Sequence, residues 1–223
     1  MTQQTLFIVD DNAEFRESAG WWLSGAGYRV QAFDGPAVAL KGLRQWQIDT
    51  LAKGADQAEP ELACLLLDVR MPQMSGLDLH DMLRAEGIVM PVIYMTGHGD
   101  VPLAVQAMQR GAVTFLEKPF EDAALELALS QAFERARELM VRAKAQAQAE
   151  VGEQAYRRRF GSLSQREREV LQGVMQGKIN KSIARELGVS VKTVDLHRAN
   201  LMTKMQARSV VDLVRMVSTG CVQ

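Results

Sequence analysis

Five polar side chains in the first half of the chain follow short apolar runs and could share one chemical site. They are Asp10, Asp11, Asp68, Thr96 and Lys118. Apolar runs of this length are typical of buried strands, and the carboxyl ends of parallel strands meet along one edge of a sheet, where open α/β sheets bind ligands. We therefore expect three carboxylates, a hydroxyl and an ammonium group to lie in one pocket.

These residue types fit the chemistry of phosphoryl groups. Converging carboxylates repel one another and raise their own pKa values unless a cation lies between them. Mg2+ prefers hard oxygen ligands and commonly joins a few carboxylates to phosphate oxygens. Lys118 can place an ammonium group on a phosphoryl oxygen, Thr96 can donate a hydrogen bond, and Asp68 can act as a carboxylate nucleophile. The set predicts a magnesium pocket in which Asp68 forms an acyl phosphate.

The elements that position this set alternate regularly between strand and helix. We predict strands at 6–9, 28–32, 63–67, 92–95 and 114–116, and helices at 14–24, 36–45, 77–85, 101–110 and from 121 onward. Five βα units predict an α/β domain with a doubly wound five-stranded parallel sheet, covered on both faces. The polar segment 45–60 is longer than a simple connection needs. It fits an extended helix or a mobile loop, and we interpret it as a tolerated insertion rather than a partner-specific surface.

The last of these helices is expected to continue as a helical linker. Its apolar residues are spaced alternately by four and three, as in a heptad seam: Leu125, Leu129, Ala132, Ala136, Leu139 and Ala143. Either two chains pair along this seam, or its first half packs on the chain's own sheet. The pattern fades between 146 and 159, so we predict a first domain at 1–126, a linker at 127–159 and a second domain at 160–223.

Charge divides the chain into two regions of opposite sign. Residues 1–155 carry 13 Lys and Arg against 22 Asp and Glu, whereas residues 156–223 carry 13 against 5. This division indicates two domains with different partners, and nucleic acid is the first candidate for the basic region, although a solvated basic face would have the same composition. Cys64 and Cys221 lie far apart, and the amino terminus lacks a signal-like segment, so we expect a cytoplasmic protein without a membrane partner.

The basic region is helical in pattern. Ser164 and Glu167 have the spacing of a capping box at the start of a helix at 165–176. Further helices are predicted at 181–187, 191–205 and 209–217. The turn Gly188–Val189–Ser190 joins two of them, which is typical of a helix-turn-helix and predicts an all-α domain.

Five stretches of the first region resemble the receiver domain of bacterial two-component response regulators. They are Val9–Asp11, Leu67–Pro72, Met74–Gly76, Met95–Asp100 and Phe115–Phe120. The resemblance implies that Asp68 accepts a phosphoryl group from a histidine kinase. It also implies that Asp11, Asp68 and the backbone carbonyl of Arg70 bind Mg2+, with Asp10 assisting through water.

The same resemblance assigns a switch. Thr96 and Phe115 match the pair whose rearrangement reports phosphorylation, and the Lys118–Pro119 peptide is expected to be cis. His98 and Arg70 match positions that tune the lifetime of the phosphoryl group.

The second region resembles the LuxR-type helix-turn-helix of the NarL/FixJ family, through 163–171, 180–184 and 189–198. The runs His197–Met202 and Met95–Asp100 favour the FixJ branch. Double-stranded promoter DNA is the implied partner, with RNA polymerase as a possible further one. The expected DNA-contacting residues are Lys181, Lys192, Arg198 and Lys204 at phosphates, Asp195, Leu196 and Ala199 at bases, and Thr193 at the same interface.

These inferences predict a transcriptional response regulator that dimerises and binds promoters when Asp68 is phosphorylated, rather than a conventional enzyme. One alternative is a phosphatase with a phosphoaspartyl nucleophile, resembling the haloacid dehalogenases. Those enzymes carry a second aspartate two residues on, where this chain has Arg70. The other alternative is a constitutive DNA-binding protein with a silent receiver, and the complete set of acids disfavours it.

Overall fold

The computed structural model describes residues 3–52, 61–97 and 101–220, which form two compact units. The first unit is Met1–Arg142 and the second is Ala143–Gln223. The division falls inside one long helix, α5, which spans Asp122–Gly161. Each unit has its own apolar core and is described by itself.

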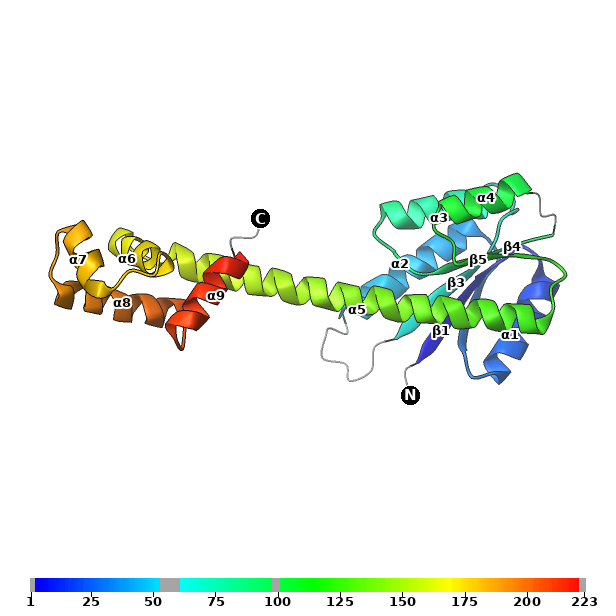
Figure 1. Cartoon of the computed structure of the whole chain (residues 1–223). Helices are drawn as coiled ribbons and strands as arrows, with labels where there is room; N and C mark the ends of the chain where they lie inside the picture. The colour runs from blue at the N-terminus through cyan, green and yellow to red at the C-terminus, as the bar shows by residue number, and fades with distance from the viewer. Residues whose placement is uncertain (1–2, 53–60, 98–100, 221–223) are drawn as a thin grey trace. The chain divides into compact units, whose positions relative to one another are not determined.

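The first unit is the predicted five-stranded parallel sheet, with strand order β2-β1-β3-β4-β5. Its strands are β1 (Gln4–Val9), β2 (Arg29–Phe33), β3 (Leu62–Asp68), β4 (Val92–Thr96) and β5 (Thr114–Glu117). Its other helices are α1 (Ala13–Gly25), α2 (Pro36–Ala52), α3 (Gly76–Ala85) and α4 (Val101–Gln109). Helices α1 and α5 cover one face of the sheet, and α2, α3 and α4 cover the other (Figure 1).

The apolar runs of the sequence are the central strands of this sheet. All seven residues of β3 are buried, because successive side chains enter the two cores alternately. Leu65 and Leu67 pack with α2, α3 and α4, whereas Cys64 and Leu66 pack with α1 and α5. A strand buried on both faces has no room for alternating polar residues, so its first polar side chain, Asp68, stands where the strand ends.

Two long helices settle alternatives that the sequence left open. Helix α2 continues through residues 46–52, so the first part of the segment 45–60 is an extended helix. Residues 53–60 lie outside the described residues. In α5, the first four seam positions, from Leu125 to Ala136, are buried in the core of the first unit. The first half of the seam therefore packs on the chain's own sheet, while Ala143 is exposed.

The second unit contains the predicted helix-turn-helix. After the end of α5 come α6 (Gln165–Met175), α7 (Asn180–Leu187), α8 (Val191–Met205) and α9 (Val210–Gly220). Gly188 ends α7 with φ 66°, a left-handed conformation that favours glycine, and Ser190 caps α8. Ile183, Val194 and Leu201 are buried in one core, as their helical spacing indicates.

Candidate functional site

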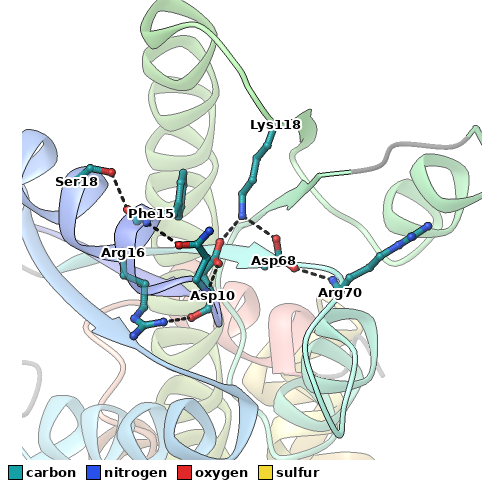
Figure 2. A network of polar contacts seen from close by, with 8 residues as sticks. Asp10, Phe15, Arg16, Ser18, Asp68, Arg70 and Lys118 are labelled. Atoms are coloured by element: carbon teal, nitrogen blue, oxygen red, sulfur yellow. Dashed lines mark hydrogen bonds and ion pairs between the residues drawn. The ribbon is translucent and has the colours of Figure 1, made fainter.

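Three of the predicted site residues meet at the carboxyl edge of the sheet. Asp10 follows β1, Asp68 ends the neighbouring β3, and Lys118 follows β5. The ammonium group of Lys118 lies between the two carboxylates, donating to Asp68 Oδ1 at 2.8 Å and to Asp10 Oδ2 (Figure 2). Asp10 and Asp68 are only 1% and 6% exposed. The structure thus places two buried carboxylates on one shared lysine.

Backbone contacts fix this arrangement. The Arg70 N–H donates to Asp68 Oδ2 at 2.7 Å and orients the carboxylate. The Lys118 N–H donates to the carbonyl oxygen of Thr96 at 2.7 Å, which ties the end of β5 to the end of β4. Thr96 is fully buried there, and the Lys118–Pro119 peptide is cis, as the resemblance implies.

The electrostatic environment of Asp68 disfavours its ionised form. Burial raises the pKa of the Asp68 carboxyl, and the charge of Asp10 raises it further. Hydrogen bonds from Lys118 and from the Arg70 N–H act in the opposite direction without cancelling the effect of burial. One ammonium group is too little positive charge for two buried carboxylates, so the site favours an additional cation.

The donor set fits Mg2+ in kind, although the acids are not all assembled. Among the described residues, no group of three or more His, Cys, Asp or Glu side chains is arranged to hold a metal ion. Asp11 is exposed, so the predicted convergence of three carboxylates is realised for Asp10 and Asp68 alone. The oxygens of Asp10, Asp11 and Asp68, with the carbonyl of Arg70, are the hard ligands that magnesium prefers.

Residues that the sequence analysis missed support Asp10 and Lys118. The Asn12 N–H donates to Asp10 Oδ1 at 2.9 Å, and Arg16 Nη1 donates to the Asp10 carbonyl oxygen at 2.7 Å (Figure 2). The ring centroid of Phe15 lies 4.2 Å from Lys118 Nζ, a cation–π contact. Asn12 also caps α1, and an Asn directly after two strand-end aspartates was the available signal.

Gly76 has a steric role beside Asp68. A Cβ atom on this residue would lie 2.1 Å from the Asp68 carbonyl oxygen, closer than a non-bonded carbon can approach an oxygen. The Gly76 N–H donates to the carbonyl oxygen of Val69 at 2.9 Å. The start of α3 therefore packs directly on the end of β3, which only glycine permits.

The predicted switch residues lie on one face of the sheet. Tyr94 on β4 is opposite Phe115 on β5, and Thr96 follows Tyr94 by two residues, so all three side chains project on the same side. Phe115 is half-buried and packs against the core beneath α3 and α4. A movement of the Thr96 side chain would therefore take place near the Phe115 ring, which is not fully enclosed.

In the second unit, four of the predicted DNA-contacting residues share an exposed face of α8. These are Lys192, Asp195, Leu196 and Ala199, at helical spacings of three and four. Leu196 is 61% exposed. The opposite face of α8, with Val194 and Leu201, is buried. Lys181 on α7 is also exposed.

Several of the predicted DNA contacts have partners within the unit. Asn180 donates to Asp195 Oδ1 and accepts from Arg198 Nη1, both at 2.6 Å, so one amide ties α7 to α8. Thr193 and Ser190 share a hydrogen bond of 2.8 Å at the start of α8.

Lys204 has a structural partner that the sequence analysis did not foresee. Its ammonium group lies 2.7 Å from the buried Glu167 carboxylate and 3.3 Å from the Ser162 carbonyl oxygen. Glu167 in turn forms the predicted capping box with Ser164. This network joins α6 to α8.

The parallel sheet with its lysine-bridged aspartate pair and the helix-turn-helix unit together define a response regulator with a DNA-binding output. Family models agree: the response regulator receiver domain matches residues 6–130, and the bacterial regulatory proteins of the LuxR family match residues 161–217. The chain therefore belongs to the two-component response regulators of the LuxR-type helix-turn-helix class, as its sequence indicates.

Relatives share both parts of this architecture. The chain is 40% identical to the transcriptional regulatory protein FixJ of Bradyrhizobium diazoefficiens, over 96% of this chain and 95% of that protein. It is 43% identical to FixJ of Azorhizobium caulinodans, over 94% and 89%. Among solved structures, response regulator StyR is 37% identical with TM-score 0.66, covering 97% of this chain and 99% of that one.

In the part of the chain that the structure describes, no helix combines the length and apolarity needed to cross a bilayer. His98, whose position was expected to tune phosphoryl lifetime, lies outside the described residues.

Proposed function

We propose that Asp68 accepts a phosphoryl group from a histidine kinase and that the modified protein dimerises and binds promoter DNA. In the transfer, an Asp68 carboxylate oxygen bonds to phosphorus while the bond from phosphorus to the kinase histidine nitrogen breaks, and that nitrogen keeps the electron pair. The observation that carries the proposal is the buried Asp68 carboxylate with the Lys118 ammonium group 2.8 Å away.

The residues around Asp68 have distinct roles in this step. Lys118 neutralises charge on the incoming phosphoryl oxygens, and the Arg70 N–H keeps the attacking carboxylate oriented. Asp10, Asp11, Asp68 and the Arg70 carbonyl would hold Mg2+, which supplies positive charge to the phosphoryl oxygens when it is bound. The residual repulsion between Asp10 and Asp68 supports a cation at this place.

The switch that we propose begins at Thr96. A phosphoryl group adds negative charge and acceptor oxygens at Asp68, and the Thr96 hydroxyl moves to donate to one of them. Phe115, which is half-buried beside it, turns into the space that Thr96 leaves. This rearrangement changes the surface formed by α4, β5 and α5.

An exposed apolar stripe on α4 supports homodimer formation at that surface. Val101, Val105 and Met108 recur at helical spacings of four and three, and all are exposed in the single chain. A phosphorylation-dependent change beneath α4 would adjust this stripe for a second copy, so dimers would place two DNA-binding units on paired half-sites.

The output that we propose is readout of promoter DNA by α8. Its exposed face carries Lys192, Asp195, Leu196 and Ala199, and the basic composition of the region supplies attraction to phosphates. The proposed interface also includes Lys181, Thr193, Arg198 and Lys204. We propose domains at 1–126 and 160–223, joined by the linker 127–159. RNA polymerase is proposed as a possible further partner, and the cytoplasm as the location of the protein.

The experiment is incubation of the full chain with acetyl phosphate and Mg2+. Wild type is expected to gain one phosphoryl group, to form dimers and to bind promoter DNA more tightly. Asp68→Asn is expected to do none of these, whereas Asp34→Asn, an exposed acid directly after β2, should behave as wild type. The proposal fails if wild type remains unmodified, or if Asp68→Asn is modified equally.

A further inference from the structure

A second pocket lies at the amino ends of β4 and β5, at the opposite edge of the sheet from Asp68. It has a volume of about 660 Å³ and is lined by α3, by the segments that precede β4 and β5, and by α5. All of its lining residues belong to the first unit. Small-molecule sites in proteins commonly have volumes of this size, roughly 300–1,000 Å³.

Positively charged side chains gather on one wall of this pocket. Arg84 on α3 and Arg110 after α4 both line it, and Arg84 Nη1 donates to the Arg110 carbonyl oxygen at 3.1 Å. Arg110 Nε also donates to Asp81 at 3.0 Å, which holds the guanidinium group in place. A fixed pair of guanidinium groups is suited to binding a carboxylate or a phosphate.

His80 contributes a buried donor to the same wall. The residue is 6% exposed, and its Nδ1 lies 2.8 Å from the Tyr94 hydroxyl. Burial raises the pKa of Tyr94, so the phenol keeps its proton and can donate to Nδ1. Burial and the charges of Arg84 and Arg110 lower the pKa of His80, which favours the neutral ring; when Nδ1 accepts from the Tyr94 hydroxyl, the ring proton lies on Nε2.

The second ring nitrogen of His80, Nε2, is the atom that can contact a ligand in the pocket. Within the described residues, Nε2 has no hydrogen-bond partner, although the ring lines the pocket. In that tautomer, the Nε2–H group can donate a hydrogen bond to a bound acceptor. An oxyanion between His80, Arg84 and Arg110 would supply that acceptor.

We propose that this pocket binds a small organic anion through His80 Nε2–H, Arg84 and Arg110. The α5 side of the pocket carries Glu134 and Glu138 together with Arg135, which pairs with Glu138, so we expect the ligand to bear its negative charge at the end near Arg84 and Arg110. Met90 and Pro91 supply apolar surface for the remainder of the ligand. The ligand class is therefore a small molecule with one anionic head group, either a carboxylate or a phosphate monoester.

The position of Tyr94 links this pocket to the proposed switch. The Tyr94 hydroxyl forms a hydrogen bond with His80. In the sheet, Tyr94 lies opposite Phe115 and precedes Thr96 by two residues, so the three side chains are on the same face. A ligand that forms a hydrogen bond with His80 would thereby also restrict the movement of Tyr94 next to Phe115. This coupling rests on the proposed phosphorylation of Asp68, and it requires that ligand and phosphoryl group change each other's binding equally.

Binding is tested by NMR titration of the unphosphorylated full chain with benzoate, methyl phosphate and, as an uncharged counterpart, benzamide. We expect saturable shifts at His80, Arg84 and Arg110 with benzoate or methyl phosphate, and which of the two binds identifies the head group. Benzamide is expected to give none. Loss of one charged hydrogen bond in Arg84→Gln or Arg110→Gln should weaken binding about tenfold.

Arg44→Gln is the matched control, because Arg44 pairs with Glu86 and does not line the pocket. The proposal is overturned if neither anion gives saturable shifts, if benzamide gives the same shifts, or if Arg44→Gln weakens binding as much as Arg84→Gln. Repeating the titration after acetyl phosphate treatment tests the coupling. If the chain binds the ligand equally tightly before and after phosphorylation, the proposed coupling is wrong and the binding site still stands. If the chain is not phosphorylated at all, that result counts against the proposed function alone.

Discussion

Each unit of this molecule has a buried carboxylate beside a lysine, Asp68 in the first and Glu167 in the second, yet the two environments shift the carboxyl pKa in opposite directions. Asp68 is 6% exposed and lies 2.8 Å from Lys118, and Glu167 is 3% exposed and lies 2.7 Å from Lys204. The pKa of Asp68 is raised, whereas the pKa of Glu167 is lowered. Burial acts in the same direction on both, so the difference comes from their partners.

Glu167 has a fully compensated charge. Burial raises the pKa of its carboxyl, but hydrogen bonds from Lys204 and from the Ser164 backbone and hydroxyl outweigh that effect. Asp68 instead shares Lys118 with Asp10, whose charge repels it. Glu167 therefore stabilises the fold of the second unit. The negative charge around Asp68 is only partly neutralised, which favours the binding of a cation and of a phosphoryl group.

Replacing Lys118 or Lys204 should show the largest difference between the two sites. Lys118→Gln leaves Asp10 and Asp68 without their shared cation, and phosphorylation by acetyl phosphate is expected to slow about 100-fold, the scale of losing one charge-stabilising donor. Lys204→Gln should leave that rate unchanged. Initial rates of modification with Mg2+ measure both variants, and equal rates for wild type and Lys118→Gln would contradict the role given to Lys118.

Neutralising Glu167 should destabilise only the second unit. Glu167→Gln weakens charged hydrogen bonds to Lys204 and to the start of α6, at a cost of about 2 kcal/mol in the free energy of unfolding. All three tryptophans, Trp21, Trp22 and Trp46, belong to the first unit. Urea unfolding followed by circular dichroism should therefore show the loss, while tryptophan fluorescence should not.

Glu169→Gln is the control for that variant on the same helix. Glu169 forms an exposed pair with Arg166, and such pairs contribute about 0–1 kcal/mol. If Glu169→Gln destabilises the unit as much as Glu167→Gln, the compensated burial of Glu167 is not what stabilises α6.

Removing the hydroxyl of the capping box should have a smaller effect. Ser164→Ala removes the acceptor for the Glu167 N–H, and the loss of such a cap is about 1 kcal/mol. The circular dichroism transition should shift in the same direction as for Glu167→Gln and by less. A shift larger than that of Glu167→Gln would mean that the cap, rather than the ion pair, dominates.

The opposite pKa shifts also predict opposite responses to acid. A lowered pKa means that Glu167 contributes stability above its ordinary value of 4.5, and the contribution is lost as pH falls through the folded-state pKa below 4.5. A raised pKa means that Asp68 loses its nucleophilic form at a pH above its ordinary value of 3.8. Unfolding and phosphorylation rates measured from pH 7 downward check both directions, and an apparent acceptor pKa below 3.8 would contradict the second.

Apolar runs predicted most of the fold because buried strands leave little choice of residue. Asp68 and Thr96 could be placed from sequence, since each is the first polar group after such a run, and Lys118 follows its run after Glu117. The extension of α2 to Ala52 was left open because polar residues form exposed helix and loop alike. The sequence did not predict ion pairs between residues that are far apart in the chain. We assigned Lys204 to a DNA phosphate, because no neighbouring residue in the sequence indicates that it contacts Glu167, 37 residues earlier.

The most direct test of the central claim locates the phosphoryl group on the chain. After treatment with acetyl phosphate and Mg2+, borohydride reduction converts an aspartyl phosphate to homoserine, which peptide mass spectrometry assigns to a position. We predict homoserine in place of Asp68 and unchanged Asp10, Asp11 and Asp34. Reduction at another aspartate, or at none, would contradict the account of Asp68 as the phosphoacceptor.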